Sequence, residues 1–371
     1  MSQTVASSRR LIVKIGSSLL VDESTGEIKR PWLDALLEDV IACRKRGQQV
    51  LIVTSGAVAV GRRPLGLAAG ALRLEEKQAA ASAGQLRLAH AYQDAAARHG
   101  VTVAQILLTP DDTEARRRHL NARATIEELL KLKALPVINE NDTVATAEIR
   151  FGDNDRLAAR VAQMISADTL VLLSDVDGLY AADPRRDPKA RHIPEIREMT
   201  AEIDAMAERA PPGASSGGMV TKLAAARIAL AAGCRMAIAK GKDLHPLAAI
   251  DHGARVTWFI PSAEPLTARK RWIAGAVNLS GAMVVDDGAA AALKRGTSLL
   301  PAGVKSVEGS FERGDAVVVR TKDGKELARG LSAYSSEDAS AIAGHKSGEI
   351  EAILGYRGRD EMIHRDDLVL T

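Results

Sequence analysis

LIVKIGSS, at residues 11–18, sets the pattern that the rest of the chain repeats. Its first five residues are apolar except for Lys14, and Gly16 ends the run before two serines. A short apolar run of this kind is typical of a strand that is buried on both faces of a parallel sheet. The glycine and the small hydroxyl residues after it can expose backbone N–H groups to an anion. On its own, the stretch is equally consistent with anion binding and with a surface lysine followed by a turn.

Five more apolar runs follow, and helix-like stretches separate them. The runs lie at residues 50–53, 101–108, 135–138, 170–173 and 236–239. The first helix-like stretch has a proline near its start, Pro31, which suits an early helical position. Its apolar stripe consists of Leu33, Leu36, Leu37, Val40 and Ile41. The alternation predicts an α/β fold with a mainly parallel sheet sandwiched by helices. Ligands of such sheets usually bind beyond the carboxyl ends of the strands, so function is sought directly after each run.

Length and composition predict a globular protein of two or more domains without a membrane span. The chain has 371 residues, of which 46% are hydrophobic and 26% charged. No stretch approaches the ~18 apolar residues of a membrane span, and residues 1–10 lack the apolar centre of a signal peptide. We therefore expect a cytoplasmic protein. Cys43 and Cys234 lie far apart, which predicts two buried thiols rather than a disulfide or a zinc site.

The composition changes near residue 280. Residues 280–371 contain 12 of the 30 glycines and carry 12 basic against 15 acidic residues, although the whole chain has a net charge of +3. This density of glycine indicates many tight turns. We predict a catalytic domain over residues 1–262, a linker over residues 263–279 and a smaller β-rich domain over residues 280–371.

Polar residues follow two of the predicted strands and precede a predicted helix. Residues 54–56 (TSG) meet a helix start, where a cap is the simpler interpretation and binding of a ligand carboxylate the alternative. Four polar residues, Asn139 to Asp142, come directly after an apolar run, and a purely structural reason for this density is difficult to find. Residues 152–155 (GDND) precede an alanine-rich helical stretch, whose N-terminus acidic side chains would also favour.

Two later segments indicate a nucleotide site. Ser174 and Asp175 follow the run at 170–173, and a loop rich in serine and glycine leads into a helix predicted to begin near Met219. This loop either closes over phosphates and brings Lys222 to them, or is a flexible linker. Neither G-x-x-x-x-G-K-[ST] nor G-x-G-x-x-G occurs, so P-loop, Rossmann and protein-kinase glycine loops lack support.

In their order and spacing, these segments resemble the amino acid kinase family. The resemblance rests first on Lys14-x-Gly16 in the first run. It rests further on four later motifs, at residues 53–57 (VTSGA), 138–142 (INEND), 152–155 (GDND) and 217–222 (GGMVTK). The chain departs from the family pattern in two places. Ser174 and Ser216 stand where close relatives usually carry threonine, and both keep the hydroxyl group.

The tail resembles a PUA domain, a small β-rich module otherwise found in RNA-modifying enzymes. This second resemblance rests on residues 296–301 (GTSLLP) and 314–317 (GDAV). The pairing of the two domains implies the branch of the family that phosphorylates L-glutamate. That reaction transfers the γ-phosphoryl group of ATP to the γ-carboxylate, gives L-glutamyl 5-phosphate and ADP, and opens proline biosynthesis.

The resemblance also implies how the residues share the work. A carboxylate is ionised near neutral pH and needs no general base, so catalysis must come from positioning and charge compensation. Lys14 and Lys222 would stabilise the transferred group from opposite sides, and Asp155 would orient both lysines. Ser55, Asp142 and Asn154 would bind glutamate, with Asp142 facing its α-amino group.

ATP and its metal ion occupy the other half of the site under the same resemblance. The residues implied for ATP are Lys14, Ser174, Asp175, Ser216, Gly217, Gly218, Met219, Val220, Thr221 and Lys222. Mg²⁺ is expected on the β- and γ-phosphates with most of its waters, so no protein ligand is nominated. The resemblance further implies feedback inhibition by proline and a homo-oligomer, either a dimer or a tetramer.

Two alternatives remain at the level of sequence. One is a protein that binds or modifies RNA through its tail, although a tail with net charge −3 lacks the basic face that phosphate binding usually requires. The other is a family member with a different acceptor, such as aspartate, acetylglutamate, carbamate or a nucleoside monophosphate. The segment at 139–142 and the PUA-like tail favour glutamate.

Overall fold

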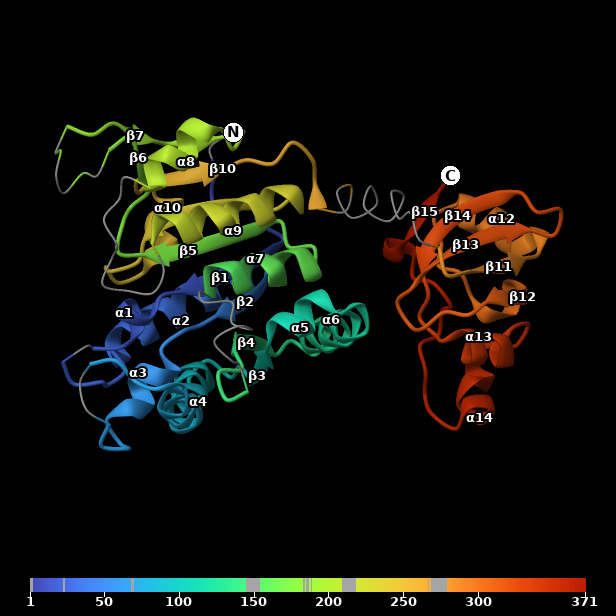
Figure 1. The fold of residues 1–371 in the computed structure, drawn as a ribbon, viewed down its shortest axis with the longest axis horizontal. Coiled ribbons are helices and arrows are strands. Elements are labelled where there is room, and N and C mark those ends of the chain that lie inside the picture. Colours follow the sequence, from blue (N-terminus) through green and yellow to red (C-terminus); the bar gives the residue numbers. More distant parts are fainter. Residues whose placement is uncertain are drawn as a thin grey trace. The chain divides into compact units, whose positions relative to one another are not determined.

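The structure is a computed structural model, and the chain in it divides into two compact units. It describes residues 3–371 except 23, 68–69, 145–153, 183, 185–186, 188, 209–217, 266 and 268–278. Unit 1 comprises Met1–Glu114 and Asn121–Pro265, and unit 2 comprises Ala115–Leu120 and Leu266–Thr371 (Figure 1). Most of the linker predicted over residues 263–279 lies outside the described residues, so the predicted domain boundaries stay predictions.

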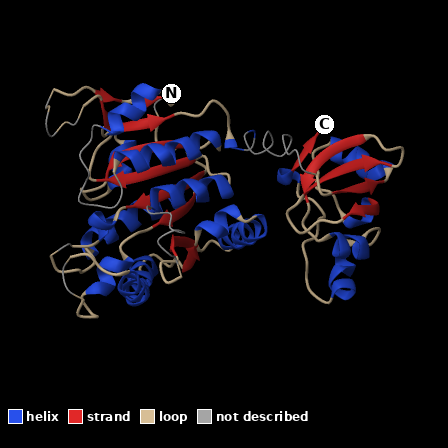
Figure 2. Ribbon diagram, in the orientation of Figure 1, coloured by secondary structure: helices blue, strands red, loops and turns tan. Residues whose placement is uncertain are grey.

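Unit 1 is built on an eight-stranded sheet with the order β3-β4-β2-β1-β5-β9-β10-β8. Figure 2 shows the strands in red and the helices beside them in blue. Its strands are β1 (Arg10–Ile15), β2 (Gln49–Val53), β3 (Val103–Leu108), β4 (Leu135–Glu140), β5 (Thr169–Ser174), β8 (Glu195–Ile196), β9 (Arg235–Lys240) and β10 (Val256–Phe259). All neighbours from β3 to β9 pair in parallel, and β10 is antiparallel to β9. The predicted parallel sheet is thus confirmed. A separate two-stranded sheet joins β6 (Leu179–Tyr180) and β7 (His192–Ile193).

Helices cover both faces of this sheet, and the alternation of side chains along β1 shows how. Leu11, Val13 and Ile15 lie in one core cluster, while Ile12 lies in the other. The first cluster includes residues of α1 (Ser17–Leu20), α2 (Arg30–Lys45), α3 (Ala57–Arg62), α4 (Leu74–Ala97) and α10 (Pro246–Asp251). The second includes residues of α6 (Arg116–Lys131), α7 (Asn154–Met164), α8 (Ala201–Glu208) and α9 (Met219–Ala231). The short helix α5 (Pro110–Glu114) follows β3.

The predicted strands differ from the observed ones in two informative places. The prediction that every strand is buried on both faces is wrong for β3. This strand lies at the edge of the sheet, Gln105 is exposed, and Leu108 is the one buried residue of the strand. The run predicted to end at Ile138 continues through Asn139 and Glu140 as part of β4, and both side chains are buried. Two of the four polar residues that we expected after the strand therefore belong to the strand itself.

Unit 2 is β-rich, as predicted. Its five-stranded sheet has the order β12-β11-β13-β14-β15. The strands are β11 (Gly281–Val285), β12 (Val304–Gly309), β13 (Ala316–Thr321), β14 (Glu326–Leu331) and β15 (Leu368–Leu370). The helices are α12 (Asp287–Lys294), α13 (Ser336–Ile342) and α14 (Ile350–Leu354), with 3₁₀ turns at Pro301–Gly303, Ser347–Glu349 and Arg365–Asp367. Its own core includes Met283, Phe311 and Val319.

Both cysteines are buried free thiols, as predicted. Burial raises the pKa of the Cys43 thiol to about 11 and that of Cys234 as well. Within the described part of the chain, every helix is too short or too polar to cross a membrane.

Candidate active site

The carboxyl ends of the central parallel strands gather the predicted site residues at one edge of the sheet. Lys14, next to the end of β1, pairs with Val53 at the end of β2, and Val53 pairs with Ile138 of β4. Thr54 and Asn139 therefore lie one residue further along neighbouring strands. Ser174 ends β5 on the other side of β1. The sheet topology thus brings together segments that lie far apart in the sequence.

A buried ionic triad lies at this edge. Lys14 shares its sheet face with Ile12, the face covered by α7 and α9. Its Nζ atom lies 2.5 Å from Oδ1 of Asp155, in the first turn of α7. The Nζ atom of Lys222, in the first turn of α9, lies 3.1 Å from Oδ2 of the same carboxylate. Asp155 is fully buried and both lysines are 6% exposed, so the predicted catalytic residues form one cluster.

The triad combines two positive charges with one negative charge in a site that is buried from solvent. Burial alone would raise the pKa of Asp155, but the ammonium groups of Lys14 and Lys222 hold this pKa below its ordinary range. The carboxylate is therefore ionised at neutral pH, and the triad carries a net charge of +1. A buried net positive charge of this kind attracts an anion, and an ammonium group has three N–H donors with which to bind one.

The lowered pKa of Asp155 predicts how acid affects stability. An unfolded aspartate has a pKa of ~3.9. Because the folded value is lower, ionised Asp155 stabilises the fold above about pH 4, and this contribution is lost as the pH falls through the folded pKa. Urea unfolding of the parent and of Asp155→Asn at several pH values tests this. As the pH is lowered from about 5 to about 3, the free energy of unfolding should fall more steeply in the parent than in Asp155→Asn. An equal dependence of this free energy on pH in the two proteins would contradict the prediction.

A second cluster joins the polar residues predicted to bind the substrate. Nδ2 of Asn154 donates to Oγ of Ser55 at 2.9 Å, to Oδ1 of Asn139 at 2.8 Å and to the backbone oxygen of Thr54. Asn154 is the residue before Asp155, so the first turn of α7 links both clusters. Asp142 lies half-buried, two residues beyond the end of β4.

The interpretation of Ser55 as a helix cap is wrong. The residue at the N-cap of α3 is Gly56, with φ at 106°, and no side chain caps this helix. The positive φ is a conformation that glycine adopts without strain. It turns the chain so that the Ser55 hydroxyl meets Asn154 instead of the helix end.

The predicted nucleotide residues are described only in part. Ser174 Oγ donates to the Asp175 carboxylate at 3.1 Å. Helix α9 begins at Met219 as predicted, with Gly218 at its N-cap, and Thr221 Oγ1 donates to the Gly218 backbone oxygen at 2.7 Å. Val220 is exposed in this first turn. Ser216, Gly217, Gly152 and Asp153 lie outside the described residues.

Three buried polar residues next to the site were not nominated from the sequence. Asn139 accepts from Asn154, Gln85 accepts from Asn139, and the Tyr92 hydroxyl lies 2.9 Å from Oγ1 of Thr54. Asn139 stands inside a motif that was singled out. Gln85 gives a weaker signal, because it is the polar member of the apolar stripe that α4 buries.

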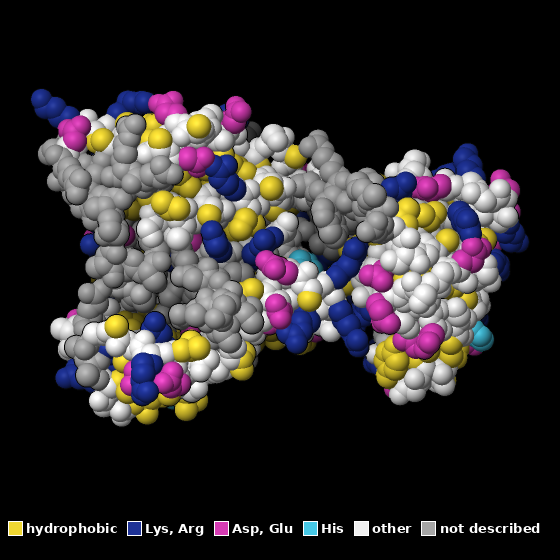
Figure 3. Space-filling model, viewed as in Figure 1, with side chains coloured by type: hydrophobic (Ala, Val, Ile, Leu, Met, Phe, Trp, Pro, Cys, Tyr) yellow, Lys and Arg dark blue, Asp and Glu magenta, His cyan; other side chains and the backbone are white. Residues whose placement is uncertain are grey.

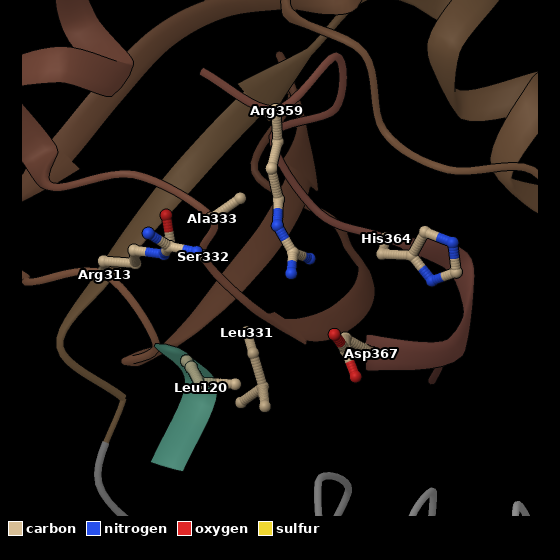
Figure 4. Close-up of a pocket in the computed structure, with 8 residues that line it drawn as sticks. All are labelled: Leu120, Arg313, Leu331, Ser332, Ala333, Arg359, His364 and Asp367. Carbon is tan, nitrogen blue, oxygen red and sulfur yellow. The ribbon is translucent and has the colours of Figure 1, made fainter. Parts of the chain in front are cut away.

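Unit 2 has a pocket of its own that contains none of the predicted site residues (Figure 4). It is lined by Leu120, Arg313, Leu331, Ser332, Ala333, Arg359, His364 and Asp367. Burial and the neighbouring Arg359 lower the pKa of Arg313. On the face that Figure 3 shows, acidic and basic side chains of unit 2 are interspersed. Among the residues that the structure describes, His, Cys, Asp and Glu form no group of three that could hold a metal ion.

Comparisons with known proteins agree with both units. A sequence model of the amino acid kinase family matches residues 9–240, and one of the PUA domain matches residues 281–354. The glutamate 5-kinase of Paramagnetospirillum magneticum is 66% identical over 366 residues and covers 99% of each chain. That of Rhodospirillum rubrum is 62% identical, over 97% of this chain and 96% of the relative. The glutamate 5-kinase of Agrobacterium fabrum is 59% identical, over 99% of this chain and 94% of the relative.

Proposed function

Because the chain belongs to the amino acid kinase family, and within it to the glutamate 5-kinases, we propose that its buried triad is the place where ATP phosphorylates glutamate. The observation that supports these residue roles is the pair of buried ammonium groups, 2.5 and 3.1 Å from the two oxygens of one carboxylate. They lie at the carboxyl ends of parallel strands, where sheets of this kind bind ligands.

The chemistry needs charge compensation more than proton transfer. An oxygen of the γ-carboxylate forms a bond to the γ-phosphorus of ATP while the bond from that phosphorus to the bridging oxygen breaks, and ADP leaves. The attacking carboxylate is already ionised, so no proton has to move. Lys14 and Lys222 donate N–H groups to the phosphoryl oxygens as negative charge shifts toward ADP. Asp155 holds both ammonium groups in place.

The second cluster supplies the amino acid site. Ser55 and Asn154 offer a hydroxyl and an amide at the carboxyl ends of β2 and β4, and Asp142 offers a negative charge for the α-ammonium group. Because Asn154 directly precedes Asp155, a substrate held by this cluster has its reacting end near the triad. Positioning of this kind can contribute a large part of the rate enhancement.

Mg²⁺ fits this site as a partner of the nucleotide. The two oxygens of Asp155 face ammonium groups, so the carboxylate is already engaged and we nominate no protein ligand. The ion would be held by the β- and γ-phosphates and by water, and it would neutralise phosphate charge there. Ser174, Asp175 and residues 216–222 would surround the nucleotide. We further propose a cytoplasmic homo-oligomer, dimer or tetramer, that proline inhibits by occupying part of the amino acid site.

A comparison of acceptors tests the function. ADP release should depend on L-glutamate and should be at least about 10²-fold slower with aspartate, acetylglutamate or UMP, since a mispositioned acceptor loses this much rate. Added proline should raise the KM for glutamate without changing kcat. Turnover of acetylglutamate or UMP but not of glutamate would overturn the assignment.

A further inference from the structure

A chain of buried amide groups leads from helix α4 to the amino acid site. Oε1 of Gln85 accepts a hydrogen bond from Nδ2 of Asn139 at 2.8 Å, and Oδ1 of Asn139 accepts from Nδ2 of Asn154 at 2.8 Å. Gln85 is 9% exposed and Asn139 is 2% exposed. An amide donates only through its nitrogen and accepts only through its oxygen, so one end of such a chain fixes the orientation of the other.

The orientation of this chain decides which atoms face the substrate. Nδ2 of Asn154 is turned toward Asn139, Ser55 and Thr54, all of which accept from it. Its Oδ1 atom points away from these three acceptors, and an amide oxygen can bind only a donor. Ser55 accepts from Asn154 through Oγ, which directs its own O–H proton elsewhere. The cluster thus offers an acceptor and a hydroxyl donor, which match an ammonium group and a carboxylate.

We propose that Gln85 is a positioning residue for recognition of the amino acid's α-ammonium group. Through Asn139 it keeps the Asn154 amide turned so that Oδ1 faces this ammonium group. This inference rests on the proposed function, because it assigns a recognition role within the same site. Gln85 itself touches neither the substrate nor the triad.

Helix α4 is anchored so that Gln85 cannot easily shift. A Cβ atom added to Gly61 of α3 would lie 1.8 Å from the backbone oxygen of Ala80, and one added to Gly84 would lie 1.8 Å from that of Ala57. The backbones of α3 and α4 are therefore in direct contact, and Figure 1 shows the two helices side by side. Gln85 directly follows the second of these glycines.

The same helix supports the neighbouring strand end. Tyr92 follows Gln85 by seven residues, which places both on one face of α4. Its fully buried hydroxyl lies 2.9 Å from Oγ1 of Thr54, whose backbone oxygen accepts from Asn154. Helix α4 thus supports the Nδ2 atom of Asn154 by two routes, through Asn139 and through Thr54.

Glutamate and glutarate together test this role, because glutarate keeps both carboxylates but has no ammonium group. In Gln85→Leu the KM for glutamate should rise about 10-fold, as expected when a hydrogen bond to a charged group is lost. The inhibition constant of glutarate, kcat and the KM for ATP should each change less than about threefold. Gln85→Glu keeps an acceptor oxygen for Asn139 and should bring the KM for glutamate back to within about threefold of the parent.

Other results would overturn the inference. Equal weakening of glutamate and glutarate would show a merely structural role, and an unchanged KM in a folded Gln85→Leu protein would show no role. If Gln85→Leu does not fold, Gln85→Met has a similar length without the acceptor, and the same outcomes decide the question. Absence of glutamate turnover by the unaltered protein would overturn the proposed function, and this inference with it.

Discussion

Replacing Lys222 with alanine is expected to lower kcat by roughly 10²–10³-fold, while the KM for glutamate changes far less. The Lys222 ammonium group compensates charge that grows only as the phosphoryl group moves, so its loss affects the transition state more than the bound substrate. Lys222→Arg should restore little, because a planar guanidinium does not reproduce a compact ammonium group beside Asp155. Steady-state kinetics on the folded variants measures both effects.

A matched control for this substitution is Lys131→Ala. Lys131 is the last residue of α6, its side chain is 72% exposed, and it pairs with Glu128 on the surface. Since β4 begins four residues later, Lys131 lies at the amino ends of the strands, opposite the site. Its replacement should leave kcat within about threefold of the parent value. A Lys222→Ala protein with kcat in that same range would contradict a transition-state role.

Asp155→Asn should reduce both activity and stability. The neutral amide removes the carboxylate that both buried ammonium groups face, which should lower the free energy of unfolding by about 3–5 kcal/mol. The same change releases both lysines from their fixed positions, so kcat should fall by about 10³-fold. Urea unfolding near neutral pH and steady-state kinetics below the transition measure the two effects separately.

Asp39→Asn separates instability from catalysis. Asp39 is another buried carboxylate, and it accepts from the backbone N–H groups of Leu247 and Ala248 at the start of α10. This site lies on the opposite face of the sheet from the triad. We expect the control to lose stability but to keep kcat within about threefold. Similar losses of kcat in both variants would argue against a specific role for Asp155.

The resemblance to the amino acid kinase family implied the triad, and each member stands in a short motif at a strand end or a helix start. Apolar runs locate parallel strands well, and the carboxyl ends of such strands must converge, so Lys14 and the first turns of α7 and α9 could be expected near one another. The distances and the burial of Asp155 could not be predicted in this way, because they depend on how α7 packs against α9.

The supporting residues were harder to find, for physical reasons. Gln85 and Tyr92 reach the site through the packing of α4 on α3, and this long-range contact leaves only two glycines as its mark in the sequence. The misread cap at Ser55 has a similar cause. A hydroxyl before a helix can cap it, but the positive φ of Gly56 and the nearby Asn154 amide favour another partner.

The measurement that tests the central claim most directly follows oxygen from the γ-carboxylate to phosphate. Glutamate labelled with ¹⁸O in its γ-carboxylate is incubated with ATP and the protein, and the product is trapped with hydroxylamine. Hydroxylamine attacks the acyl carbon and releases phosphate that keeps the bridging oxygen. If the γ-carboxylate attacks the γ-phosphorus, each phosphate released carries one ¹⁸O atom and a hydroxamate forms. Glutamate-dependent ADP release with unlabelled phosphate would contradict the account.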